Sequence, residues 1–183
     1  MSHQPFVERR RTWNAGLRAH FRELEERWNR TQPPLAVVHL PPPTNPGAGP
    51  PRLADIGLSE ECVRTLETKR PNLLLIGSST KVTCLLQLIE PSVTHPLVSV
   101  RAERLTLPET AIGTLVLHDA NRLDATQQDQ LHRWLDVHPL SQVIATSSQP
   151  LFPLVVRNSF SAVLFFRLNV RSLMIEEASP EAV

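Results

Sequence analysis

The chain has 183 residues, 41% of them hydrophobic, and a formal net charge of +1 at pH 7. This length and composition predict one globular domain with attached segments. The small net charge gives no overall electrostatic attraction to nucleic acid or to a membrane surface. The two cysteines, Cys62 and Cys84, fall in apolar helical patterns and are expected to be buried, reduced thiols. Because we find no membrane-span pattern and no signal-peptide pattern, we expect a cytoplasmic protein without membrane association.

Residues 1–30 are predicted to form an N-terminal amphipathic helix, spanning roughly residues 6–29. Its apolar residues recur at steps of four, four, three and four, which is the helical period: Trp13, Leu17, Phe21, Leu24 and Trp28. Such a stripe must be buried, either on the chain's own domain or on a protein partner or second copy. Seven arginines against four glutamates surround it, and the arginine run at 9–11 is typical of a solvated face, so DNA contact is not favoured.

Residues 31–52 are predicted to be a proline-rich linker. Eight of the 17 prolines lie between Pro33 and Pro51. Because proline fixes φ and removes a backbone donor, this composition favours extended polyproline II structure. The segment at 35–40, Leu-Ala-Val-Val-His-Leu, interrupts the prolines and is either a short strand or a docking segment. The main domain is therefore placed at residues 53–183.

Strands and helices alternate in this main domain. Apolar runs predict strands at 72–77, 97–100, 114–117, 142–146 and 171–175. Helical patterns occupy 58–66 and 82–89, and a third helix is predicted to begin after Asp124, with Gln127 completing a capping box. The alternation predicts an α/β fold, in which a parallel sheet carries helices on both faces.

Three blocks of this domain resemble the AAA+ ATPase domain of bacterial enhancer-binding proteins, the activators of sigma-54 RNA polymerase. Residues 113–119, Gly-Thr-Leu-Val-Leu-His-Asp, resemble the family's Walker B strand G-T-L-F-L-D-E. Residues 142–148 resemble its sensor I strand, and residues 160–170 are similar to F-R-E-D-L-Y-Y-R-L-N-V. The resemblance covers about residues 73–170, and it implies a P-loop NTPase core of the AAA+ type.

The phosphate-binding loop departs from the family pattern. A P-loop of the form G-x-x-x-x-G-K-[ST] holds phosphates with glycine amides and a lysine. In the ungapped alignment Gly77 and Ser79 keep their places, but Val82 replaces the last glycine and Thr83 replaces the lysine. Lys81 lies two positions early. We therefore expect a strand-to-helix turn with a vestigial nucleotide site.

The other chemical positions of the family are altered as well. His118 replaces the magnesium-binding aspartate, and imidazole is a poor magnesium ligand. Asp119 replaces the catalytic glutamate, and Ser148 replaces the sensor I asparagine. Of the two arginines that the family presents to a neighbouring subunit, Ser161 stands at the first position and Arg167 remains at the second, where an ion pair is a structural alternative. No spacing of histidines or acids predicts a metal site.

Two larger parts of the family are also missing. The segment between residues 101 and 113 has no room for the insertion that touches sigma-54, and the chain ends at Val183, so we expect no helical lid and no DNA-binding helix-turn-helix. These losses predict a protein that is not an enzyme and needs no cofactor: a regulatory or scaffold protein acting through protein–protein contacts. The alternative is an ATP-binding, sigma-54-dependent transcription regulator with an atypical site built from Lys81, Thr83 and Asp119.

Overall fold

The computed structural model describes residues 36–40, 56 and 58–176, together with the single residue 26. The chain divides into two compact units, residues 1–34 and 35–183, and the fold described here is that of the second. The predicted N-terminal helix and its five apolar anchors lie outside the described residues, as does most of the proline-rich linker. Among the helices that are described, none is both long and apolar enough to cross a membrane.

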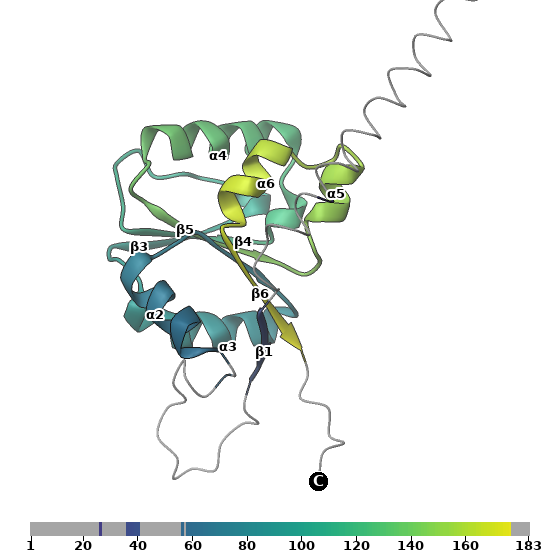
Figure 1. Ribbon diagram of the computed structural model, residues 1–183. Coiled ribbons are helices and arrows are strands. Elements are labelled where there is room, and N and C mark those ends of the chain that lie inside the picture. The colour runs from purple at the N-terminus through teal and green to yellow at the C-terminus, as the bar shows by residue number, and fades with distance from the viewer. Residues whose placement is uncertain (1–25, 27–35, 41–55, 57, 177–183) are drawn as a thin grey trace, which may run out of the picture. The chain divides into compact units, whose positions relative to one another are not determined.

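A six-stranded, all-parallel sheet forms the centre of the second unit (Figure 1). Its strands follow one another in space in the order β1-β6-β2-β5-β4-β3. They are β1 (Ala36–His39), β2 (Leu73–Ile76), β3 (Leu97–Arg101), β4 (Thr114–His118), β5 (Gln142–Ser147) and β6 (Arg171–Glu176). The five strands predicted from residue 72 onward are confirmed, and so is the parallel α/β architecture.

Strand β1 lies in the segment that the sequence left open between a strand and a docking segment. It pairs in parallel with β6, with Ala36 opposite Leu173, and the side chain of Val38 is fully buried. The sheet therefore extends into residues 31–52, which the sequence analysis assigned to a linker. The physical reason is that β6 has an open edge, and a short apolar segment can satisfy the backbone groups of that edge.

Helices cover both faces of the sheet (Figure 1). On one face lie α2 (Glu60–Lys69) and α3 (Ser79–Ile89); on the other lie α4 (Ala125–Val137), α5 (Phe152–Val156) and α6 (Ala162–Leu168). The predicted helices are confirmed, although α3 begins three residues earlier than expected. The capping box is also confirmed: the N–H of Gln127 donates to Asp124 Oδ1 at 2.8 Å, and the N–H of Asp124 donates to Gln127 Oε1 at 3.0 Å.

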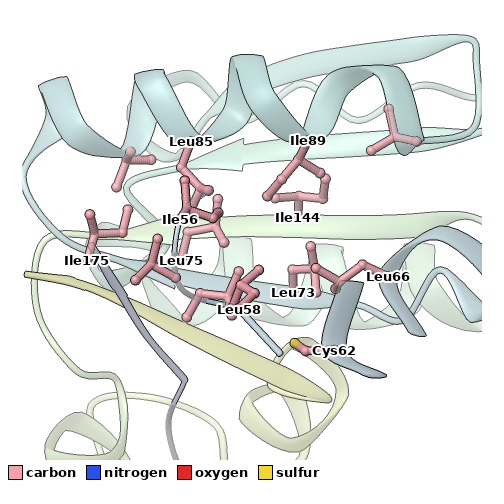
Figure 2. Packing of buried hydrophobic residues seen from close by; sticks show 14 of the residues in the cluster. Ile56, Leu58, Cys62, Leu66, Leu73, Leu75, Leu85, Ile89, Ile144 and Ile175 are labelled. Atoms are coloured by element: carbon pink, nitrogen blue, oxygen red, sulfur yellow. The ribbon is translucent and has the colours of Figure 1, made fainter. Parts of the chain in front are cut away.

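An apolar cluster joins α2 and α3 to the sheet. Figure 2 shows Leu85 and Ile89 of α3 directed toward Ile144 of β5 and the leucines of β2. Cys62 of α2 belongs to this cluster, as predicted, but Cys84 is exposed, so the expectation that both thiols are buried was wrong. Cys84 lies beside the buried stripe of α3 rather than on it, because one residue turns a helix by about 100°.

Candidate functional site

The carboxyl ends of β2, β4 and β5 meet at one edge of the sheet. The chain leaves β2 through α3 on one face, and it leaves β5 through α5 and α6 on the other; ligands of parallel sheets bind at such a switch point. Gly77 directly follows β2, and its N–H donates to the carbonyl of Ser147 at 3.0 Å. Asp119 directly follows β4, and its N–H donates to Thr146 Oγ1 at 3.2 Å. The structure therefore gathers Gly77, Asp119 and Ser148 at this edge.

The turn from β2 into α3 has the strand–turn–helix form expected of a phosphate loop. Ser78 is the N-cap residue, with extended backbone, and its carbonyl accepts the first helical hydrogen bond from the N–H of Val82 at 2.9 Å. Ser79 is exposed in the first turn. Gly77 also has a packing reason to be glycine, because a Cβ atom there would lie 3.2 Å from the Cβ of Ile175. Retention of this glycine is therefore explained without a nucleotide.

The next turn of α3 carries the replaced glycine and lysine positions. Val82 is only 4% exposed and packs in the apolar cluster beneath the helix. Thr83 is exposed, and its hydroxyl donates to the carbonyl of Ser79 at 2.9 Å. Lys81 is half-buried in the first turn. Positive charge is thus present in the first turn, at Lys81, and absent at the position from which a P-loop lysine reaches phosphate.

His118, the last residue of β4, stands where the family has its magnesium-binding carboxylate. Its Nε2 lies 2.8 Å from Ser99 Oγ on the neighbouring strand β3. Burial lowers the pKa of His118 below its ordinary value of 6.5, the guanidinium of Arg101 lowers it further, and the carboxylate of Asp119 opposes both. The imidazole is therefore neutral at neutral pH and offers nitrogen rather than carboxylate oxygen.

Asp119 has left-handed backbone, with φ of 59° and ψ of 43°. Its carboxylate lies 3.7 Å from the guanidinium of Arg101, and both side chains are substantially exposed, so this ion pair contributes little stability. Ser148 follows β5 with an exposed side chain, while its neighbour Ser147 bonds Asn121 Oδ1 through its hydroxyl at 3.2 Å. The two positions that would act on water in an ATPase thus hold a short, ion-paired acid and a serine.

Arg167 is not brought to this edge. Its guanidinium packs on the last turn of α4, where it pairs with the Asp136 carboxylate and donates to the carbonyl of Leu135 at 3.1 Å. Its own carbonyl accepts from Asn72, which precedes β2, so this residue lies at the amino ends of the strands. The ion pair named as a structural alternative is present. Ser161 has a local role too: its hydroxyl caps α6 by accepting from the N–H of Leu164 at 3.3 Å.

Sequence reasoning missed three residues of this edge. Ser99 and Arg101 contact His118 and Asp119 from β3, and Thr146 holds the backbone of Asp119 from β5. Polar residues in the carboxyl-terminal halves of β3 and β5 were the available signal, but using it required the strand order. Across residues 36–40, 56 and 58–176, no group of three or more His, Cys, Asp or Glu side chains is arranged to hold a metal ion.

Comparisons with known proteins support the fold. No protein-family model and no curated protein sequence matches the chain. Among solved structures, the chain is similar to NtrX from Brucella abortus. The ATP complex of NtrX has a TM-score of 0.53 and 17% identity, and the match covers 62% of this chain and 33% of NtrX. The ADP complex has a TM-score of 0.51 and 19% identity, and the match covers 61% of this chain and 33% of NtrX. A third NtrX structure has a TM-score of 0.51 and 18% identity, and that match covers 66% of this chain and 37% of NtrX.

This likeness shows the fold alone, a parallel α/β core shared with NtrX. The match spans about a third of NtrX, and the identity is low. The chemistry of this chain must therefore be argued from its own residues.

Proposed function

We propose that this protein is a non-catalytic regulatory or scaffold protein, built on the fold of a sigma-54 activator AAA+ domain and acting through protein–protein contacts. The observation that supports this proposal most directly is His118, which aligns with the family's magnesium-binding aspartate. His118 is a neutral imidazole whose Nε2 is engaged by Ser99 at 2.8 Å. Because Mg²⁺ takes oxygen ligands and bridges the phosphates during transfer, this position lacks the group that hydrolysis needs.

The phosphate side of the edge supports the same proposal. Thr83 stands at the lysine position, and its hydroxyl is used within α3. Val82 is buried in the core rather than exposed as a flexible glycine. Arg167 stabilises the end of α4 within its own chain. Val82, Thr83 and Arg167 thus each make contacts within their own domain.

The partner-binding element of the proposal is the predicted helix at residues 6–29. Aromatic anchors such as Trp13 and Trp28 are common hot spots of interfaces, and truncating one typically costs about 2 kcal/mol or more. The test compares the full-length chain with residues 35–183, because β1 belongs to the sheet and must be kept. Sedimentation and affinity purification should show that a complex formed by the full chain is lost on truncation and in the double variant Trp13→Ala, Trp28→Ala. A monomeric, partnerless full chain whose thermal stability falls on truncation would contradict this role.

A second candidate is an ATP-binding transcription regulator that uses an atypical site. The observation in its favour is the retained turn from Gly77 into the N-terminus of α3, with Lys81 in the first turn, because helix N-termini attract phosphate. Calorimetric titration with Mg-ATP separates the candidates. The non-catalytic proposal expects no binding heat, whereas the second expects binding that Lys81→Ala removes and the control Lys69→Ala, on α2, leaves intact.

A further inference from the structure

A cavity lies between α3 and the β3 edge of the sheet; Gly77 and Ser79 of the phosphate turn do not line it, but Thr83 and His118 do. One wall is a stripe of α3 and the residue that follows it, at positions 83, 86, 87 and 90, which is the spacing of one helical face. The other wall consists of residues that face α3 from β3, β4 and β5, including Leu97, Val116 and His118. The volume is about 160 Å³. We call this space the edge cavity.

The edge cavity exists because α3 covers only part of its face. The buried stripe of α3, at Val82, Leu85 and Ile89, packs over the central strands. The neighbouring stripe, which contains Leu86, faces β3 at the margin of the sheet, where Leu97 is half-buried and Ser99 is exposed. Within the part of the chain that the structure describes, α2 and α3 are the α-helices on this face, and Ile56 and Val93 add to its apolar cluster (Figure 1). At this margin the cavity is lined by Leu86 and Leu97, which are half-buried and pack against the apolar cluster.

A polar pair stands in the wall of this mostly apolar space. Ser99 lies opposite Val116 in the register of β3 and β4, so His118 is its diagonal neighbour, and the two side chains are joined at 2.8 Å. A hydroxyl has one donor and two acceptor sites, so the oxygen of Ser99 retains hydrogen-bonding capacity after its bond to His118. A ligand that enters the cavity can thus form one directed hydrogen bond while its remaining surface contacts Leu86, Leu97 and Val116.

We propose that the edge cavity binds a small uncharged molecule that carries a ring and one hydrogen-bonding group. The size follows from the volume: an enclosed apolar cavity of about 150 Å³ holds benzene, and this space has a similar volume but is partly open to solvent. Glu90, an exposed acid in the lining, disfavours an anionic ligand. The ligand is therefore different in kind from a nucleotide, and it would share Thr83 and His118 with the candidate nucleotide edge.

The probe for this site is phenol, added to the uniformly ¹⁵N-labelled full-length chain and followed by amide chemical shifts. We expect shifts concentrated at residues lining the edge cavity, with saturation in the millimolar range. Benzene, which lacks the hydroxyl, should bind about tenfold more weakly, as expected for one lost hydrogen bond. Benzoate should give no saturable shifts.

Two variants fill the cavity from opposite walls: Ser99→Leu from β3 and Thr83→Leu from α3. Both residues are exposed, so each variant should retain a native amide spectrum, and one of the two suffices if the other does not fold. Each should abolish the saturable phenol shifts. The matched control Ser148→Leu adds the same side chain at an exposed position outside the cavity and should bind phenol normally. The absence of saturable shifts, shifts centred elsewhere, or shifts that survive in a folded cavity-filling variant would overturn the proposal.

Discussion

Arg167 offers a direct comparison between a structural and a chemical role for an arginine. Arg167→Ala removes the ion pair with Asp136 and the hydrogen bond to the carbonyl of Leu135, both at the last turn of α4. The guanidinium is 31% exposed, and it also adds a positive charge at a helix C-terminus, which typically contributes about 0.3–1 kcal/mol. Adding one charge-assisted hydrogen bond, we expect Arg167→Ala to lower the free energy of unfolding by about 1–2 kcal/mol. For a domain of this size, that loss lowers Tm by about 2–8 °C.

Arg133→Ala is the matched control. Arg133 pairs with Asp129 one turn away on α4, but its side chain is 77% exposed and the pair is of the surface type. Such a pair contributes about 0.3–0.5 kcal/mol. Urea unfolding of both variants, followed by circular dichroism, measures the difference, and a double-mutant cycle with Asp136→Ala isolates the coupling of Arg167 to its partner. Equal losses in the two variants, together with zero coupling, would refute a structural role for Arg167.

Three further predictions concern β3, β4 and the connection between them. The fold lowers the pKa of His118, so below pH 6.5 the unfolded chain binds more protons than the folded chain. The free energy of unfolding should therefore fall as the pH drops from 6.5 toward the folded pKa. Urea midpoints at pH 7.5 and 5.5 should thus differ less in His118→Asn than in the native chain, and an unchanged difference would be contradictory. Gly113→Ala should destabilise the fold by about 2 kcal/mol or more, since its Cβ would lie 2.2 Å from the carbonyl oxygen of Thr94; an unaltered Tm would contradict this. The connection from β3 to β4 is short and tied to α4 by the Trp134 bond to the carbonyl of Pro108, so we expect no co-purification with sigma-54; co-purification lost on mutation of residues 101–113 would refute this.

Sequence patterns predicted most of the sheet because its central strands are buried on both faces. Runs such as Leu73–Ile76 and Thr114–His118 are buried along almost their whole length, which is why they are continuous apolar stretches. Strand β1 was harder to recognise, because it is four residues long and flanked by prolines, and its pairing with β6 is a long-range contact. Exposure of Cys84 was missed since a short apolar helix does not reveal which of its faces meets the sheet.

The candidate site was only partly predictable. Alignment to the family pattern located Gly77, Asp119 and Ser148, and the structure brings these together. It did not reveal that Ser99 engages His118, because that contact depends on β3 lying beside β4. Nor did spacing along the chain show that Arg167, on α6, packs against the end of α4 at the opposite edge of the sheet. Contacts between strands distant in sequence decide both features.

ATP turnover by the purified full-length chain tests the central claim most directly. His118 in place of a magnesium-binding carboxylate and Thr83 in place of a lysine predict that phosphate release with Mg-ATP does not exceed that of heat-inactivated protein. The same absence is expected for Asp119→Ala. Phosphate release by the native chain that Asp119→Ala abolishes, while the control Lys69→Ala on α2 retains it, would contradict the claim and identify this edge as a working ATPase site.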